Sequence, residues 1–289
     1  MILVTGAAGK TGQAIIQALA GRGAAVRAFV YRPDQAARVQ SSGTQEVVIG
    51  ELQDEAAFRQ AAQGTEALYH ICPNMHPDEV TIGRIAIRAA QAAGVAQFVY
   101  HSVLHPQVEA MPHHWHKLRV EEMLFESGLA YTILQPAAYM QNILAGWTLI
   151  NEQGIYRVPY RPEARLSLVD LEDVAAAAAI TLTEPGHHGA IYELVGPDAL
   201  SQHEVAAVLG QVLGRPVRAE QILIEAWTGQ AQAAGLGAYA IETLVKMFRY
   251  YDRYGFWGNG RVLSWLLNRP PTSFAAFIER IKASKDQEA

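Results

Sequence analysis

Short apolar runs alternate with longer segments of helical periodicity along the first half of the chain. The apolar runs predict β-strands over residues 2–5, 25–30, 46–49, 67–72, 97–102 and 131–134. Apolar positions spaced three or four apart predict helices between them, over 11–20, 34–40, 54–62, 79–93 and 117–127. Strands that alternate with helices indicate βαβ units, and strands that are apolar throughout indicate burial on both faces. The pattern therefore predicts an α/β protein with a doubly wound parallel sheet.

After Pro136 the alternation weakens. Helices are predicted over 169–182, 201–213 and, with interruptions at glycine, 226–265, and a seventh strand over 190–195. Ser201 with Glu204 three positions later is typical of a capping box, and the polar end beyond Ile281 is expected to fray. We expect residues 1–150, with a strand near 190–196 returning to the sheet, to form one domain. Residues 151–289 are expected to form a smaller, mainly helical C-terminal substrate lobe.

Composition narrows the class of protein. With 289 residues, 50% hydrophobic and 18% charged, the chain is typical of a globular protein with a large core. A formal net charge of −5 makes nucleic acid a poor partner. The single cysteine, Cys72, excludes an internal disulfide and suits a reducing compartment. We recognise no signal peptide, and the most apolar stretch, 174–182, is too short to span a bilayer. A cytoplasmic protein without a membrane partner, monomer or homodimer, is expected.

A glycine-rich turn connects the first strand to the first helix. It comprises Gly6, Ala7, Ala8, Gly9, Lys10, Thr11 and Gly12. The first glycine allows a tight turn, the second lets the backbone approach a pyrophosphate, and the third lets the helix pack against the sheet. The helix N-terminus offers free N–H groups and partial positive charge to phosphates. The turn therefore predicts a Rossmann-type dinucleotide site, with an ordinary strand–helix turn as the alternative.

The same turn contains a partial match to another phosphate-binding motif. Gly9-Lys10-Thr11 resembles the end of a P-loop, whose first glycine would fall at position 4. That position is Val4, so the phosphate cradle of a nucleoside triphosphatase lacks its first element.

The end of the second strand bears on the choice of dinucleotide. NAD-binding folds usually place an acid there to bind the ribose 2′-hydroxyl, but this strand runs into Arg32 and Pro33. A guanidinium suits the 2′-phosphate of NADP, and Lys10 adds charge nearby. Asp34 is expected to cap the following helix. The sequence thus favours NADP(H) over NAD(H), with a solvated surface arginine as the alternative.

Further motifs extend nearly from end to end of the chain. They are Gly6–Gly12, Arg32-Pro33, Gly50-Glu51-Leu52-Gln53-Asp54, Tyr100-His101-Ser102, Lys117 before Glu121-Glu122, Ser127–Leu134 with Pro136, Val169-Asp170 with Glu172-Asp173-Val174, and Tyr192-Glu193-Leu194 before Gly196-Pro197. With them the sequence resembles the NmrA-like branch of the atypical short-chain dehydrogenase/reductase superfamily. That branch includes quinone reductases, triphenylmethane-dye reductases, plant isoflavone-type reductases and NADP-sensing regulators.

The resemblance implies where a cofactor lies. The segment with Glu51 and Leu52 would end the third strand beside the adenine. The segment Ile71-Cys72-Pro73 would lie near the nicotinamide ribose, and the segment around Pro136 would border the nicotinamide. Ser102 and Lys117 are further cofactor-binding candidates. The carboxyl ends of the strands are also where open parallel sheets bind ligands.

The usual catalytic motif of short-chain dehydrogenases, Tyr-x-x-x-Lys, is absent. Lys117 lies on the expected helix, but His113 occupies the position four residues before it. In isoflavone-reductase-like relatives a lysine with similar spacing is the catalytic group, and Lys117 lies eleven positions before Gly128. Lys117 is our candidate for ribose binding or proton donation, with a surface lysine as the alternative.

Five histidines surround Lys117. They are His101, His105, His113, His114 and His116. Histidine suits proton transfer near neutral pH, so His113 is a candidate acid, with ordinary loop histidines as the alternative. His-His-x-His is not a known zinc spacing and only Glu109 lies nearby among the acids, so no metal is expected.

Aromatic residues supply candidates for substrate contact. Tyr139 lies in a stretch that lines the substrate cleft in the quinone- and dye-reductase relatives, so it is a candidate to stack on an aromatic substrate; core packing is the alternative. The ring-rich segment 248–257 offers the same two possibilities, or an interface.

Two classes of function follow from these features. An NADPH-dependent reductase would pass hydride to a small quinone-like or aromatic acceptor, a reaction that needs little acid–base machinery because the cofactor performs the difficult step. A redox sensor would bind NADP(H) without turnover and signal to a partner protein. We expect the reductase, with the sensor and then an isomerase or epimerase as alternatives.

Overall fold

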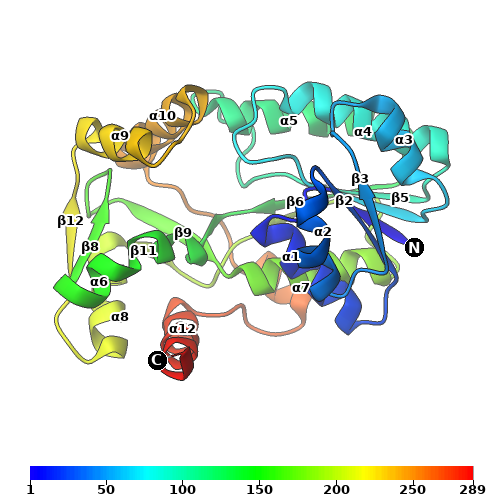
Figure 1. The fold of residues 1–289 in the computed structure, drawn as a ribbon. Helices are drawn as coiled ribbons and strands as arrows, with labels where there is room; N and C mark the ends of the chain where they lie inside the picture. Colours follow the sequence, from blue (N-terminus) through cyan, green and yellow to red (C-terminus); the bar gives the residue numbers. More distant parts are fainter. Residues whose placement is uncertain (289) are drawn as a thin grey trace. The chain divides into compact units, whose positions relative to one another are not determined.

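The computed structural model describes the backbone of residues 1–288 and the side chains of residues 1–285 (Figure 1). The chain divides into two compact units. Unit 1 comprises residues 1–109, 113–136 and 171–192, and unit 2 comprises 110–112, 137–170 and the chain from 193 onward. Each unit therefore contains segments far apart in the sequence, and no single cut separates them.

Unit 1 is built on a seven-stranded sheet with the order β10-β6-β5-β4-β1-β2-β3. The strands are β1 Ile2–Val4, β2 Val26–Val30, β3 Glu46–Ile49, β4 Ala67–His70, β5 Gln97–His101, β6 Tyr131–Pro136 and β10 Ala190–Leu194. Strands β1 to β6 pair in parallel. The strand order runs outward in both directions from β1 and β4, which confirms the predicted doubly wound, Rossmann-type sheet and places its switch point between these two strands.

Helices cover both faces of this sheet. They are α1 Lys10–Gly21, α2 Ala36–Ser41, α3 Glu55–Ala62, α4 Glu79–Ala93, α5 Pro112–Phe125 and α7 Leu171–Thr183, with a 3-10 turn η1 at Pro33–Gln35. Helices α3, α4 and α5 lie on one face, and α1 packs with α7 on the other (Figure 1). Asp54 begins α3 by accepting the N–H groups of Ala56 and Ala57, and Gly94 ends α4 in a left-handed conformation.

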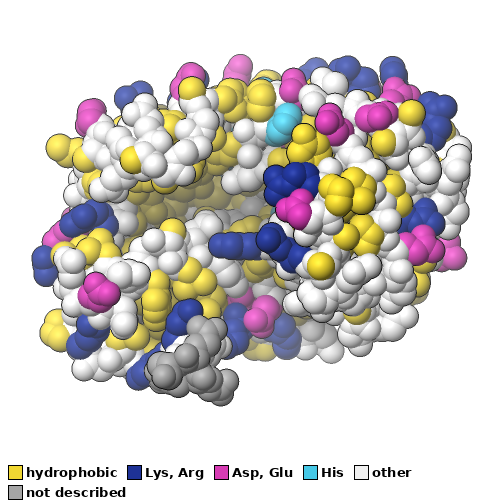
Figure 2. Space-filling model, in the orientation of Figure 1, with side chains coloured by type: hydrophobic (Ala, Val, Ile, Leu, Met, Phe, Trp, Pro, Cys, Tyr) yellow, Lys and Arg dark blue, Asp and Glu magenta, His cyan; other side chains and the backbone are white. Residues whose placement is uncertain are grey.

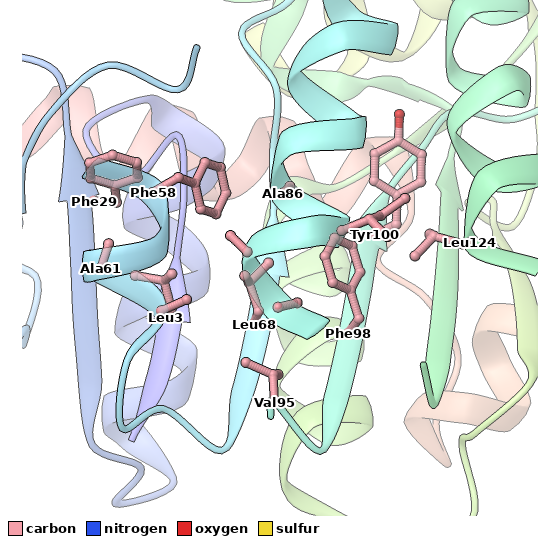
Figure 3. Packing of buried hydrophobic residues seen from close by; sticks show 14 of the residues in the cluster. Leu3, Phe29, Phe58, Ala61, Leu68, Ala86, Val95, Phe98, Tyr100 and Leu124 are labelled. Carbon is pink, nitrogen blue, oxygen red and sulfur yellow. The ribbon is translucent and has the colours of Figure 1, made fainter. Parts of the chain in front are cut away.

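A hydrophobic core of unit 1 lies between the sheet and α3, α4 and α5 (Figure 3). Leu3, Leu68 and Phe98 from the strands are fully buried there, and the rings of Phe29 and Phe58 meet edge to face with their centroids 5.4 Å apart. Burial of these side chains holds β1 and β4 in place, and so fixes the two strand ends between which ligands bind in this fold.

Unit 2 has two small sheets, with strand orders β11-β9-β7 and β12-β8. Its strands are β7 Ala138–Tyr139, β8 Ile155–Val158, β9 Arg165–Val169, β11 Ala199–Ser201 and β12 Arg218–Gln221. Its helices are η2 Met140–Gly146, α6 Trp147–Gln153, α8 Gln202–Leu213, α9 Ile224–Ala233, α10 Ala238–Tyr254, α11 Arg261–Leu267 and α12 Phe274–Glu288. These five strands were not predicted. The predicted capping box of Ser201 and Glu204 at the start of α8 is confirmed.

Two helical predictions for unit 2 need correction. The helix expected over 226–265 is three helices, because Gly235 and Gly255 adopt positive φ and interrupt it. Helix α12 continues to Glu288, beyond the point at Ile281 where fraying was expected. Within residues 1–288, no helix is long and apolar enough to cross a membrane. On the face drawn in Figure 2, basic, acidic and hydrophobic side chains are interspersed.

Candidate functional site

The turn after β1 is formed by backbone atoms that approach closely. Gly6 has φ +59°, and a Cβ placed on it would lie 2.9 Å from the carbonyl oxygen of Ile71. A Cβ on Gly12 would lie 2.5 Å from the oxygen of Gly6, closer than real Cβ atoms come to any neighbour. Positions 6 and 12 therefore require glycine, whereas Gly9 has slightly more room, with 3.3 Å to the oxygen of Gly6.

Gly9 is the N-cap of α1, and no side chain in the described part of the chain caps the helix there. The first intrahelical hydrogen bond runs from the N–H of Gln13 to the oxygen of Gly9. The N–H groups of Lys10, Thr11 and Gly12 thus have no partner within the helix, which is the arrangement that binds phosphate at helix N-termini.

A buried polar contact fixes this turn to the neighbouring strand. The N–H of Ile71 donates to Oγ1 of Thr5 over 2.9 Å, and the hydroxyl donates to the oxygen of Ile71 over 3.1 Å. Oγ1 also lies 2.9 Å from Nδ1 of His70, a fully buried ring whose pKa burial lowers to about 4. Thr5 and His70 are site-building residues that the sequence analysis missed, because only the strand pairing brings them together.

A cavity of about 440 Å³ lies beside the turn, entirely within unit 1. It is bounded by the segments that follow β1, β2, β3 and β4. The lining residues are Gly6, Ala7, Ala8, Gly9, Phe29, Val30, Tyr31, Gln35, Gly50, Glu51, Leu52, Gln53, Pro73, His76 and Ile82. The predicted cofactor residues that line it are Gly6, Ala7, Gly9, Glu51, Leu52 and Pro73, whereas Lys10, Thr11, Gly12, Arg32, Ile71, Cys72, Ser102, Lys117 and Pro136 do not.

Arg32 lies at the edge of this region without lining the cavity. Its guanidinium pairs with Asp34, with Nε 3.0 Å from Oδ1, and both side chains are exposed. The hydrogen bond with Asp34 raises the pKa of Arg32, and Asp34 has a lowered pKa in turn. The prediction that Asp34 caps the next helix is wrong, because Gln35 is the N-cap of α2 and Asp34 binds Arg32 instead. Gln35 Oε1 accepts the N–H groups of Tyr31 and Arg32 and so shapes the strand end.

Lys117 belongs to a buried group that we call the Lys117 network, formed by Glu79, Tyr100, His101 and Lys117. Nζ of Lys117 donates to Oε1 of Glu79 over 3.0 Å and to the backbone oxygen of His101 over 3.1 Å. The hydroxyl of Tyr100 donates to the same carboxylate oxygen over 2.7 Å, and Nζ lies 5.3 Å from the centre of its ring. Lys117 therefore holds its charge in a fixed place between α4, β5 and α5.

Electrostatics within the network keep Glu79 ionised. Burial by itself raises the pKa of this carboxyl, but the charge of Lys117 and the hydrogen bonds from Tyr100 and Lys117 outweigh burial and lower the pKa. Glu79 is only 3% exposed, so its charge depends on these partners. Sequence reasoning missed Glu79, because an acid in the first turn of a helix is ordinarily a surface residue that complements the helix dipole.

A second buried carboxylate holds Ser102. The hydroxyl of Ser102 donates to Oε1 of Glu121, and the amide of Gln135 donates to Oε1 and Oε2 over 2.9 and 3.1 Å. Burial raises the pKa of Glu121 despite these hydrogen bonds. Ser102 is itself buried, so its predicted cofactor contact would require its backbone or a shift of this hydrogen bond.

The histidines near Lys117 are mostly buried and uncharged. Burial lowers the pKa of His101 to about 3, of His113 to about 2 and of His114 to about 4. His101 Nδ1 lies 2.7 Å from the hydroxyl of Tyr69, while Nδ1 of His113 has no hydrogen-bond partner among the described residues. At neutral pH His113 is therefore neutral imidazole. The described residues contain no group of three or more His, Cys, Asp or Glu that could hold a metal ion.

Three predicted residues remain. Cys72 is buried, which raises the pKa of its thiol. Pro136 ends β6 in unit 1, and Tyr139 is a half-buried residue of β7 in unit 2. In the ring-rich segment, Phe248, Tyr251 and Phe256 are core residues, whereas Tyr254 and Trp257 are 58% and 61% exposed.

Comparison with known proteins adds to this geometry. The model of the NmrA-like family matches residues 1–289. The chain is 33% identical over 246 residues to the NAD(P)H azoreductase of Xenophilus azovorans, covering 84% of this chain and 83% of the relative. It is 36% identical over 229 residues to a (4-alkanoyl-5-oxo-2,5-dihydrofuran-3-yl)methyl phosphate reductase of Streptomyces griseus, covering 78% of each. A crystal structure of the NADPH-dependent quinone oxidoreductase of Escherichia coli with NADPH matches with a TM-score of 0.86 and 28% identity, over 98% of this chain and 100% of that one.

Proposed function

The chain belongs to the NmrA-like family, as its motifs predicted, and on that premise we propose that it transfers hydride from NADPH to a small quinone-like or aromatic acceptor. It is an NAD(P)H-dependent oxidoreductase, as are the azoreductase and the quinone oxidoreductase it resembles. The observation that carries the proposal is the turn from Gly6 to Gly12, which has no room for a Cβ at its two ends and lies beside a cavity of about 440 Å³.

The residues present fit a dinucleotide. The backbone at Gly6, Gly9 and the uncapped start of α1 would hold the pyrophosphate. Glu51 and Leu52 line the part of the cavity after β3, where the adenosine would bind. Arg32 beside that cavity would bind the 2′-phosphate and so favour NADPH over NADH. When bound, NADPH supplies the hydride.

The other residues of the site position groups and move a proton. Reduction of a quinone-like acceptor needs a proton on oxygen in addition to the hydride. The pKa of His113, lowered to about 2 by burial, leaves this ring without a proton to donate as an imidazolium at neutral pH. We therefore assign proton donation or ribose binding to Lys117, whose Nζ donates a hydrogen bond to Glu79. Tyr139 would stack on the acceptor ring.

The experiment follows NADPH oxidation by absorbance at about 1 µM protein, a working concentration for ordinary turnover numbers, against quinones, azo dyes and triphenylmethane dyes. We expect turnover with at least one quinone and slower turnover with NADH in place of NADPH. Tight NADPH binding without NADPH oxidation in the presence of any acceptor would contradict the reductase function and favour a redox sensor. The Lys117→Met variant, checked for folding by circular dichroism, distinguishes the two roles of Lys117. Loss of proton donation lowers kcat and leaves the dissociation constant of NADPH unchanged, whereas loss of ribose binding raises that dissociation constant.

A further inference from the structure

Unit 2 contains a cavity of its own, of about 440 Å³, formed where the segment after β8 meets the end of β12 and the last turns of α10. We call it the arginine cavity, because Arg161, Arg249 and Arg253 line it. Asp252 is the single acidic residue of the lining, which leaves a net positive charge. The volume is within the range of small-molecule sites. The cavity shares no lining residue with the one beside the glycine turn.

The three arginines of this cavity are exposed, and their guanidinium groups have few partners among the described residues. Arg249 has neither a hydrogen bond nor an ion pair with any described residue, and the guanidinium of Arg253 lies over the ring of Tyr254, 5.1 Å from its centroid. Arg161 reaches the backbone oxygen of Arg253 only at 3.5 Å. Asp252 forms no ion pair with these arginines among the described residues, and its Oδ1 accepts the backbone N–H of Arg161 over 2.7 Å. By contrast, Arg157 and Arg218 of the same unit both pair with Glu220.

The arginines lie on segments that aromatic packing and strand pairing hold together. Tyr160, next to Arg161, packs its buried ring against Phe248 and Tyr251 of α10, at centroid distances of 6.1 and 5.9 Å. Trp227 of α9 meets Phe248 edge to face at 4.7 Å. On the other side, β12 pairs in parallel with β8, and the chain beyond it continues the ladder through the N–H of Ile222 to Val158. These contacts hold cations together that would otherwise repel one another.

The lining also defines the ligand chemistry. Arg249 and Arg253 lie four positions apart on α10, so their side chains share one face of the helix, an arrangement of like charges that a bound anion relieves. Guanidinium forks match the geometry of phosphate and carboxylate oxygens. Pro159 and Ile224 add apolar surface and Gln221 adds an amide, so the cavity suits an anionic group attached to an apolar body.

We propose that the arginine cavity of unit 2 is a binding site for a small organic phosphate or carboxylate. It is separate from the dinucleotide site of unit 1, the turn Gly6–Gly12 and the cavity beside it, which we call the cradle. Arg249 and Arg253 contact the anionic group, and Arg161 adds a third positive charge beside it. Pro159 and Ile224 contact the apolar part of the ligand. The site does not depend on the reductase activity, since none of its residues belongs to the cradle or the Lys117 network.

Calorimetric titration of phenyl phosphate into the protein saturated with NADP⁺ tests this site, because the cradle is then occupied. We expect binding in the sub-millimolar range, weaker binding of inorganic phosphate, and none of phenol. The double variant Arg249→Gln/Arg253→Gln should weaken phenyl phosphate at least ten-fold, whereas Arg88→Gln, an exposed helical arginine of unit 1, should not. Asp252→Asn, which keeps the oxygen that accepts the N–H of Arg161, should tighten binding a few-fold.

Benzoate in place of phenyl phosphate distinguishes a carboxylate ligand from a phosphate one. Absence of phenyl phosphate binding, or equal binding by the wild type and the double variant, would overturn the proposal. Both substitutions lie on the exposed face of α10, so the variants are expected to fold, and their melting temperatures verify this.

Discussion

The glycine turn after β1 and the Lys117 network around β5 lie in the same unit, yet they are built in opposite ways. The turn depends on the absence of side chains, since a single Cβ at Gly12 would lie 2.5 Å from a backbone oxygen. The network depends on the presence of two charges, because Glu79 and Lys117 are 3.0 Å apart and mostly shielded from water. Adding one carbon atom damages the turn, whereas removing one charge damages the network.

Because of this difference, we expect substitutions in the turn to lower cofactor affinity and substitutions in the network to lower the stability of the fold. The one titratable side chain of the turn, Lys10, is exposed, so a change in the turn is expected to act first on phosphate contacts. A buried ion pair that loses one partner leaves an uncompensated charge, so a change there acts on the whole fold. Three substitution experiments examine this contrast.

The largest effect is expected from Glu79→Gln. It leaves the ammonium of Lys117 without its carboxylate, and breaking a buried pair in this way destabilises a protein by about 3–5 kcal/mol. Urea unfolding measures the loss. The control is Glu55→Gln, which breaks the exposed pair with Arg59 and is expected to change stability by less than about 0.5 kcal/mol. Similar losses in both variants would show that burial of the network has no special effect.

A smaller effect, measured as the affinity for NADPH, is expected from Gly12→Ala. The added Cβ pushes against Gly6 and Ala7, which displaces the backbone that would contact the pyrophosphate. We expect NADPH to bind about 100-fold more weakly, a change of about 2.7 kcal/mol. Gly21→Ala, at the other end of α1, is the matched control, because its Cβ would meet no described atom within 4 Å. Unchanged NADPH affinity in Gly12→Ala would rule out a cradle built from backbone.

The smallest effect is expected from Arg32→Ala, which removes a positive charge beside the dinucleotide cavity. We expect NADPH to bind about ten-fold more weakly, the contribution of one charge-assisted contact, with NADH unaffected. Asp34→Asn should have the opposite effect, because it releases the guanidinium from its present partner. Dissociation constants of both cofactors, measured by fluorescence titration, check the pair. Parallel losses for NADPH and NADH would mean that Arg32 does not recognise the 2′-phosphate.

The sequence pattern predicts unit 1 well because its determinants are local. Apolar strands, helical periodicity and the spacing of Gly6, Gly9 and Gly12 lie within short windows. Their predicted bounds match the structure to within a few residues, except that α5 begins at Pro112, five residues before the predicted start at Lys117. Unit 2 is less predictable. Strand β12, Arg218–Gln221, has a polar sequence that does not suggest a strand, and it forms only by pairing with β8, some sixty residues earlier.

The same distinction applies to the candidate site. The turn is visible in the sequence, whereas the partner of Lys117 is 38 positions away and that of Thr5 is 65 positions away. Nothing local marks Glu79 or His70 as part of the site, because their roles arise from strand order and helix packing. Arg32 was predicted from the sequence, but its pairing with Asp34 was not, because Asp34 was expected to cap the next helix.

The buried thiol of Cys72 has a chemical consequence for a protein that meets electrophiles. Quinones react with nucleophilic thiolates, and a thiol with a raised pKa is protonated at neutral pH. Cys72 is the single cysteine of the chain and is 4% exposed, so it offers such a reagent neither a thiolate nor an open approach. Burial thus protects this thiol from covalent modification by the class of acceptor we propose for the protein.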